Sequence, residues 1–205
     1  MTLAPTKARV AAALLGGLTI APACLRKAEV RYYTLAGAAP ARPVRAAPVA
    51  YTVHVAAASV PEALDRPELV LRLSDTEVAV DDHHRWAEPL RTGIARAVAD
   101  GLARALDGAL VSASEQRTTQ PTSDVELTMD VRRLDVSLAD GVAIEVAWRA
   151  RWANDGPTRT GRATVRQRAP QSGGYDGAVA ACAAALDAVA GDIARSVRLE
   201  VLSRR

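Results

Sequence analysis

The clearest hydrophobic pattern in the chain predicts a three-stranded antiparallel meander. Apolar side chains occupy every second position over residues 125–131 and again over residues 142–152. Turn residues follow each of these strands, at Asp140 and Gly141 and at residues 154–157, and residues 160–168 form the returning strand. Since side chains in a strand alternate between faces, this sheet has one apolar face and one polar face.

Two longer stretches carry apolar residues at the 3–4 spacing of amphipathic helices. The first stripe consists of Leu90, Ile94, Val98, Leu102 and Leu106, widened by Ala97, Gly101 and Ala105. The second consists of Tyr175, Val179, Cys182, Leu186, Val189, Ile193 and Val197. Pro89 is tolerated only near a helix start, and Asp107 with Gly108 ends the first helix. Each helix is expected to pack one face against a sheet.

Shorter apolar runs predict further strands before and after the first helix. They cover residues 31–35, 51–55, 69–73, 77–80 and 110–111. The order of elements is therefore strands, helix, β-meander, helix. We predict an α+β fold, with an antiparallel or mixed β-sheet and two long amphipathic helices packed on it.

The N-terminus has the features of a secretory signal peptide. Lys7 and Arg9 precede a short apolar run, which closes with Ala21, Pro22 and Ala23. The run is too short to span a bilayer, which takes roughly 20 apolar residues. Cys24 follows directly, as in a bacterial lipobox, where this cysteine is acylated. We expect residues 1–23 to be the signal peptide and Cys24 to carry the lipid.

An ordinary signal peptidase site is the alternative. Lipoboxes usually carry Leu where this chain has Ala21, and residues 21–23 also fit the A-x-A pattern that would release a soluble protein. Leu25 in place of Asp favours the periplasmic face of the outer membrane. Residues 24–50 are expected to hold the lipidated N-terminus, a short strand and a Pro/Ala linker, and residues 51–205 a single α+β domain.

Composition excludes nucleic acid as an expected partner. The formal net charge is +3, and it falls to +1 once Lys7 and Arg9 leave with the signal peptide. No run of five like charges is present. Trp148 and Trp152 share one face of their strand, opposite an arginine-bearing face, and we interpret them as core aromatics. An apolar face left uncovered by the helices would instead bind a partner or lipid.

Few residues suggest catalysis or metal binding. His83 and His84 follow two aspartates, but adjacent histidines project in different directions, and a zinc site usually takes three or four protein ligands. We interpret this segment as a solvated helix start that Asp81 or Asp82 caps. Cys182 lies on an apolar helix face and is interpreted as an inert, buried thiol. No catalytic residue, metal or cofactor is predicted.

Three segments together resemble the PqiC-type family of ABC-type transport auxiliary lipoproteins. They are residues 31–35, 61–70 and 85–90. The positions that carry the resemblance are Tyr32, Tyr33, Leu35, Asp65, Arg66, Pro67, Arg85, Trp86 and Pro89. Within this pattern, residues 65–67 are expected to fix the turn before a strand. Trp86 is expected to anchor the helix start, and Pro89 to set its first turn.

The resemblance implies a lipid-anchored periplasmic subunit at the outer membrane. Such a subunit would pair with an MCE-domain protein of a lipid transport system and help to maintain membrane integrity, and a homo-oligomeric ring would fit the family. No nucleotide-binding motif or membrane-spanning helix is predicted, so we expect a non-enzymatic adaptor. Two alternatives stay open: a lipid carrier with its own apolar pocket, and a metal-dependent periplasmic enzyme using His83 and His84.

Overall fold

The computed structural model describes residues 29–35, 49–114, 123–170 and 173–203. The elements are β1 (Arg31–Tyr33), β2 (Tyr51–Ala56), the 3-10 helix η1 (Glu62–Leu64), β3 (Glu68–Arg72), β4 (Val78–Trp86), α1 (Leu90–Ala105), β5 (Ala109–Ser114), β6 (Val125–Ser137), β7 (Gly141–Trp152), β8 (Thr158–Gln167) and α2 (Gly174–Ser203). The predicted α+β fold is confirmed. The predicted signal peptide, Cys24 and most of the predicted Pro/Ala linker lie outside the described residues.

The larger sheet contains five strands in the order β5-β2-β6-β7-β8. Strand β2 pairs in parallel with both neighbours, and β6, β7 and β8 form the predicted antiparallel meander. The apolar face predicted from the alternating pattern is confirmed, since the apolar residues of β6 and β7, including Trp148 and Trp152, are buried. The predicted strand at residues 110–111 is longer than expected, because all six residues of β5 pair with β2.

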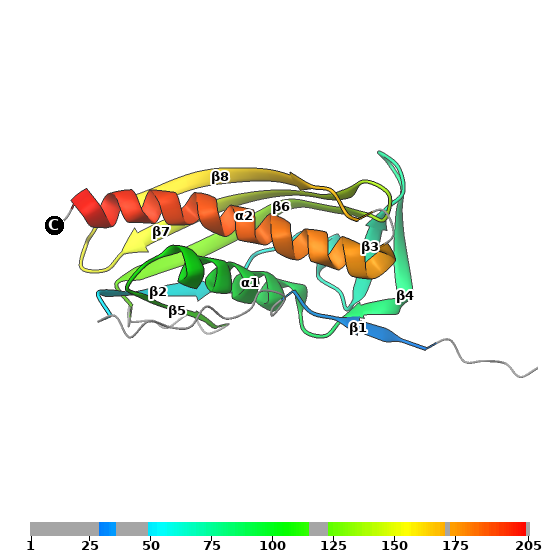
Figure 1. Ribbon diagram of the computed structural model, residues 1–205, viewed down its shortest axis with the longest axis horizontal. Coiled ribbons are helices and arrows are strands. Elements are labelled where there is room, and N and C mark those ends of the chain that lie inside the picture. The colour runs from blue at the N-terminus through cyan, green and yellow to red at the C-terminus, as the bar shows by residue number, and fades with distance from the viewer. Residues whose placement is uncertain (1–28, 36–48, 115–122, 171–172, 204–205) are drawn as a thin grey trace, which may run out of the picture.

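Both helices lie on the apolar face of this sheet (Figure 1). Helix α1 contacts β2 and β5, whereas α2 contacts β7 and β8, and the two helices pack against each other. They approach closely at Gly101, where a Cβ atom would lie 2.6 Å from Cβ of Ala190. The core is therefore assembled mainly from aliphatic residues of the two helices and the sheet.

Helix α2 is a core helix, although its length and hydropathy would also suit a membrane span. The span that meets those criteria covers residues 174–202, and 61% of its most apolar window is buried inside the domain. Its buried stripe is the predicted one from Val179 to Val197, with Cys182 only 2% exposed. The apolar character of α2 therefore reflects its packing on β7, β8 and α1.

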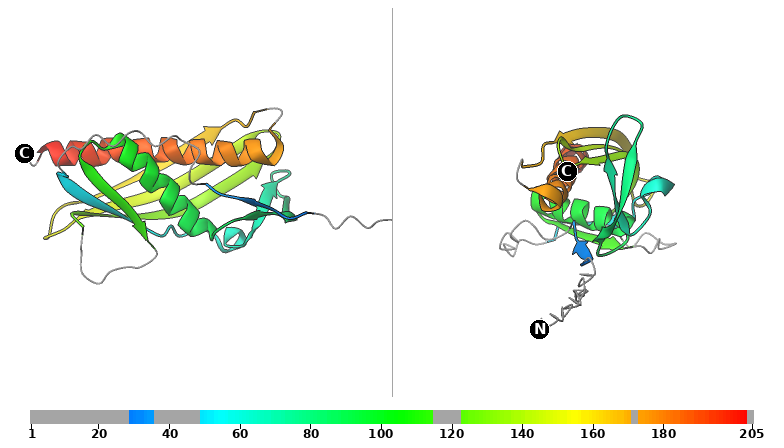
Figure 2. Two further views of the ribbon diagram at one scale, coloured as in Figure 1. Left: turned by 60° about the horizontal axis from the view of Figure 1, so that its bottom comes forward. Right: turned by 90° about the vertical axis from the view of Figure 1, so that its right-hand side faces the viewer.

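A smaller sheet covers one end of the molecule. Its order is β1-β4-β3, with β1 parallel and β3 antiparallel to β4. The C-terminal end of α2 lies at the opposite end (Figure 1), and Figure 2 shows the smaller sheet from the side on which the chain enters. The strand that follows the N-terminal region is thus hydrogen-bonded into the domain.

The predicted helix start at residues 81–89 is wrong. Residues 81–86 continue β4, and α1 begins only at Leu90, after Pro89, with no side-chain cap. Asp81 accepts a hydrogen bond from the backbone N–H of His83, at 2.9 Å, within an irregular stretch of β4. These residues are extended because they pair with two strands: Asp81 and Arg85 pair with β3, and residues 84–86 pair with Arg31–Tyr33 of β1, about 50 residues earlier. A local pattern could not reveal that pairing.

Candidate functional site

The three segments that carry the family resemblance meet at the end of β4. Strand β1 runs beside β4 so that Tyr33 aligns with Trp86. The N–H of Ala87 donates to the carbonyl of Tyr33 at 2.7 Å, and the N–H of Trp86 donates to the carbonyl of Pro67, also at 2.7 Å. The backbone of β4 therefore joins the other two segments directly, although they are about 30 residues apart in the chain.

Two of these segments, at the turn before β3 and at the end of β4, line an open hollow of about 380 Å³, which we call the motif groove. Its lining is formed by Asp65, Arg66, Pro67, Trp86, Ala87, Glu88, Pro89, Leu90 and Arg91. Five of the nine positions that carry the resemblance belong to this lining. One wall comes from the turn before β3 and the other from the connection between β4 and α1.

The turn at residues 65–67 lies between η1 and β3, where the sequence predicted a turn. The N–H of Leu64 donates to the carbonyl of Pro61 at 2.9 Å, and the N–H of Arg66 donates to the carbonyl of Leu64, also at 2.9 Å. Pro67 has no N–H of its own, and its carbonyl accepts from Trp86. The turn thus reverses the chain and presents the side chains of residues 65–67 to the groove.

Trp86 and Pro89 give the groove its apolar part. Trp86 ends β4 and is only 8% exposed, so most of its ring belongs to the core. It lies four residues before α1. Leu35 supports the same region from behind, since its Cδ1 lies 3.7 Å from where a Cβ of Gly93 would be.

Ion pairs rim the groove. Arg91 on α1 reaches Asp65 across the groove at 3.0 Å. Glu68 at the start of β3 contacts both Arg66, at 3.5 Å, and Arg85, at 3.2 Å. These pairs are partly exposed, so each contributes little to stability. Their main effect is to place both charge signs around an apolar floor.

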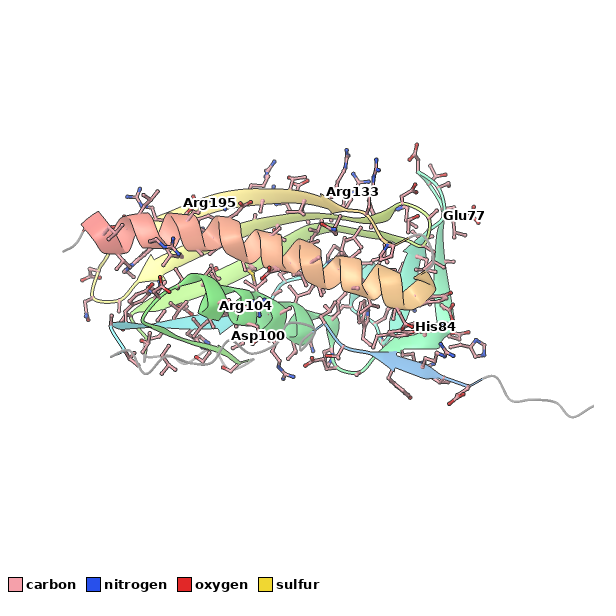
Figure 3. The ribbon with its side chains drawn as sticks, in the orientation of Figure 1. Glu77, His84, Asp100, Arg104, Arg133 and Arg195 are labelled. Atoms are coloured by element: carbon pink, nitrogen blue, oxygen red, sulfur yellow. The ribbon has the colours of Figure 1, made fainter. Side chains whose placement is uncertain are left out.

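A second cluster joins β1, β4 and α2 behind the groove. The ring of His84 stacks on Tyr175 at 3.5 Å between centroids and lies 5.8 Å from Tyr33. The hydroxyl of Tyr175 donates to the carboxylate of Asp81. Nδ1 of His84 lies 3.1 Å from Oδ1 of the same carboxylate, at angles that do not fit a hydrogen bond. Figure 3 places His84 at the end of the domain near β1.

The electrostatics of this cluster favour an ionised aspartate. The hydrogen bond from Tyr175 is the main cause that lowers the pKa of Asp81 to about 2. Burial, followed by the hydrogen bond to Asp81, raises the pKa of Tyr175 to about 12. Both groups therefore keep their charge states across the neutral range and hold the start of α2 to β4.

The three histidines, which the sequence offered as candidates for metal binding or catalysis, do not form one cluster in the structure. His84 packs between two tyrosines, whereas His83 is exposed and His54 lies in β2 of the larger sheet. Within the described ranges, no three His, Cys, Asp or Glu side chains come close enough to hold a metal ion. Complete burial raises the pKa of the Cys182 thiol to about 12, as an unreactive core thiol requires.

Some residues of the site have no signal in the sequence. Asp81 was interpreted as a helix cap, whereas it binds Tyr175, which is 94 residues later. Arg91 was not singled out, and it faces Asp65 across the groove. Tyr32, by contrast, carries the resemblance but is 66% exposed beside Arg85 and lines no part of the groove. Cys24 lies outside the described residues.

Solved structures share this fold. A crystal structure of an uncharacterized protein is 20% identical, covers 82% of this chain and 99% of its own, and has a TM-score of 0.62. A crystal structure of a protein from Xanthomonas campestris is 21% identical, covers 79% of this chain and 92% of its own, and has a TM-score of 0.59. A comparison with curated proteins gave no match.

The sequence pattern of one protein family matches residues 33–194. This match begins in β1, passes through both walls of the motif groove and ends within α2. It therefore covers most of the chain and includes the whole site described above. The resemblance predicted from three short segments is confirmed, and the chain belongs to the family of ABC-type transport auxiliary lipoprotein components.

Proposed function

We propose that this chain is an outer-membrane-tethered periplasmic lipoprotein that serves an MCE-type lipid transport system as a non-enzymatic adaptor. One observation carries the proposal: two separated segments of the family pattern form the walls of one open groove, and the third segment pairs with β4 beside it. Membership in a family of transport auxiliary lipoproteins supports the transport role. The MCE-domain partner, the outer membrane and the adaptor role are our inference.

The composition of the motif groove suits a protein partner. Protein interfaces combine a buried aromatic or aliphatic centre with a polar rim, and Trp and Arg are over-represented among the residues that dominate binding. The groove has Trp86, Pro67 and Leu90 in its lining and paired charges at its edge. These are the features we would expect for an anchor residue of a partner, surrounded by charge pairs that set its orientation.

The tether that precedes the first strand is short, because Arg31–Tyr33 already pair with β4. Seven residue steps separate Cys24 from Arg31, and a fully extended chain covers at most about 25 Å over that length. An acylated Cys24 would therefore hold the end of the domain that bears the motif groove near the membrane surface.

Two hollows in the described part of the chain, the motif groove and a larger one, do not support the lipid-carrier alternative. The motif groove is rimmed by Asp65, Arg66, Glu88 and Arg91. A larger hollow of about 680 Å³, on the polar face of the meander, has three arginines in its lining. Binding an acyl chain takes an apolar pocket, and charged linings oppose this because the charges would lose water.

A matched pair of α1 variants tests the adaptor proposal. Arg91→Glu reverses one charge at the motif groove, where Arg91 pairs with Asp65 at 3.0 Å. Arg104→Glu makes the same change near the other end of α1, where Arg104 pairs with Asp187 at 2.7 Å. Figure 3 shows Arg104 well away from His84 and the smaller sheet. Each full-length variant would be isolated from its native envelope after mild crosslinking.

The proposal predicts that an MCE-domain protein is recovered with the unmodified chain and with Arg104→Glu. Recovery with Arg91→Glu should fall by about fivefold or more, the effect of losing roughly 1 kcal/mol at a contact residue. Equal recovery of the MCE-domain protein with both variants would show that the motif groove is not part of the interface. Absence of any MCE-domain protein, with the unmodified chain intact in the membrane, would contradict the adaptor role.

A further inference from the structure

A second hollow lies on the polar face of the meander and shares no lining residue with the motif groove. It encloses about 680 Å³ over β6, β7 and β8. The strand register aligns Arg149 with Thr128 on one side and Thr160 on the other, so these side chains form one row on the outer face. The neighbouring position on β7 is Ala147, whose small side chain leaves room beside Arg149.

Three arginines dominate the charge of this hollow, which we call the arginine basin. They are Arg132, Arg149 and Arg162, and Asp130 is the one carboxylate among the lining residues. The basin therefore carries net positive charge. Hydroxyl groups of Thr128 and Thr160 add neutral donors on either side of Arg149.

The arginines of the basin make weaker contacts with carboxylates than Arg151, which lies on the same face of β7. Arg132 and Arg162 approach Asp130 and Glu145 only to 3.6 and 3.5 Å, beyond a usual hydrogen bond. The Arg149 side chain makes no ion pair or hydrogen bond with another residue of the described ranges. Outside the basin, Arg151 binds Glu126 at 2.6 Å. The Arg149 guanidinium is thus free to bind an external anion, and Arg132 and Arg162 beside it each hold only a long ion pair.

We propose that the arginine basin binds the phosphate of an anionic glycerophospholipid headgroup. Guanidinium groups form paired, charge-assisted hydrogen bonds with phosphate oxygens, and three of them with two hydroxyls can surround a phosphodiester. The volume lies within the range of small-molecule sites and exceeds what phosphate alone would fill. The guanidinium and hydroxyl groups of the open basin take the headgroup, and the acyl chains stay outside. This proposal does not depend on the identity of the protein partner.

Calorimetric titration of the acylated full-length protein in non-ionic detergent tests the proposal. The probes are glycerophosphoglycerol, which is the deacylated headgroup of phosphatidylglycerol and does not enter micelles, and inorganic phosphate. The variants are Arg149→Ala and Arg149→Lys. Arg195→Ala is the control, since Arg195 is an exposed arginine of α2 that pairs with Asp192. Thermal unfolding of each variant checks that its fold is intact.

The expected result is saturable binding of one glycerophosphoglycerol per chain, weakened by added salt. Arg149→Ala should weaken it about tenfold, as loss of a charge-assisted hydrogen-bond pair predicts, and Arg149→Lys should restore part of the loss. Arg195→Ala should bind as the unmodified chain does. No saturable binding, or equal weakening by Arg149→Ala and Arg195→Ala, would overturn the proposal. Inorganic phosphate binding as tightly as the headgroup would overturn the lipid assignment.

Discussion

Asp81, His84 and Tyr175 link β4 and α2 through side-chain contacts. Tyr175 belongs to the first turn of α2, and its hydroxyl donates to Asp81 in β4, while its ring lies flat on His84. The hydrogen bond is the largest cause of the lowered pKa of Asp81. Since the carboxylate is more acidic in the folded state, its contribution to stability is present above its ordinary pKa and disappears as pH falls.

Tyr175→Phe removes the donor and keeps the ring stack. We expect the free energy of unfolding to fall by about 1 kcal/mol at neutral pH, a value discounted for the partial exposure of Asp81. The pKa of Asp81 is about 2 in the folded chain, against 3.8 ordinarily. The difference between the two proteins should therefore shrink as pH falls from about 4 to about 2. Urea unfolding across this range measures it, and a difference that does not change with pH would contradict the account.

Cys182 provides a second test at the residue scale. Its thiol is fully buried in α2 and has a pKa raised to about 12, so the reactive thiolate is scarce and inaccessible. In a chain with Cys24→Ser, we expect a thiol reagent to label Cys182 only when the protein unfolds. Labelling should be slow in buffer and complete in denaturant. Rapid labelling of the folded chain would show that α2 is less well packed than described.

Small residues set the distance between α1 and α2 at the scale of elements. Gly101 faces Ala190 so closely that an added Cβ atom would lie 2.6 Å from the alanine methyl group. Gly93 lies in the same helix, but a Cβ there would meet nothing nearer than 3.6 Å. Gly101 is therefore needed for the close packing of the two helices, whereas Gly93 is not, although both belong to α1.

Gly101→Ala and Gly93→Ala should change stability in opposite directions. At Gly101 the added methyl group forces the helices apart, and we expect a loss of about 1–3 kcal/mol. At Gly93 it fits, and the better helix propensity of alanine should stabilise the protein by about 0.5–1 kcal/mol. Denaturant unfolding of both variants makes the comparison. A loss of the same size at both positions would mean that helix crossing is not limited by Gly101.

Local periodicity predicted the elements that bury a regular face. Apolar residues alternate in β6 and β7 and follow the 3–4 spacing in α1 and α2. Each pattern predicts that one face of the element is buried, and the structure confirms this. Residues 81–86 were wrongly interpreted because their strand depends on pairing with β3 and with β1, which lies about 50 residues earlier. The division into two sheets was likewise hidden, since strand order depends on contacts between distant segments.

The motif groove shows how far sequence can lead at the scale of the whole molecule. The family resemblance gave nine positions but no geometry, and five of them line one hollow. Arg91 and the Asp81–Tyr175 contact were missed, because each acquires its role only from a partner that the fold brings near. The placement of the groove beside β1 likewise emerges only from the parallel pairing of β1 with β4.

The tether makes a prediction of its own. If Cys24 carries acyl chains, Cys24→Ala should move the protein from the membrane fraction to the soluble periplasmic fraction, since stable anchoring depends on burial of those chains. Fractionation followed by immunoblotting measures this, and unchanged unfolding behaviour of the variant shows that the domain is intact. Recovery of Cys24→Ala in the membrane fraction would mean that another contact holds the protein there.

Site-specific photocrosslinking in the native envelope tests the central claim most directly. A photoreactive side chain would replace Arg66 at the motif groove, and a second chain would carry it at Arg195, a 71% exposed side chain toward the far end of α2 (Figure 3). The account predicts a crosslink to an MCE-domain protein from position 66 and none from position 195. A crosslink to that protein from position 195 alone, or none from either position, would contradict the motif groove as the docking surface.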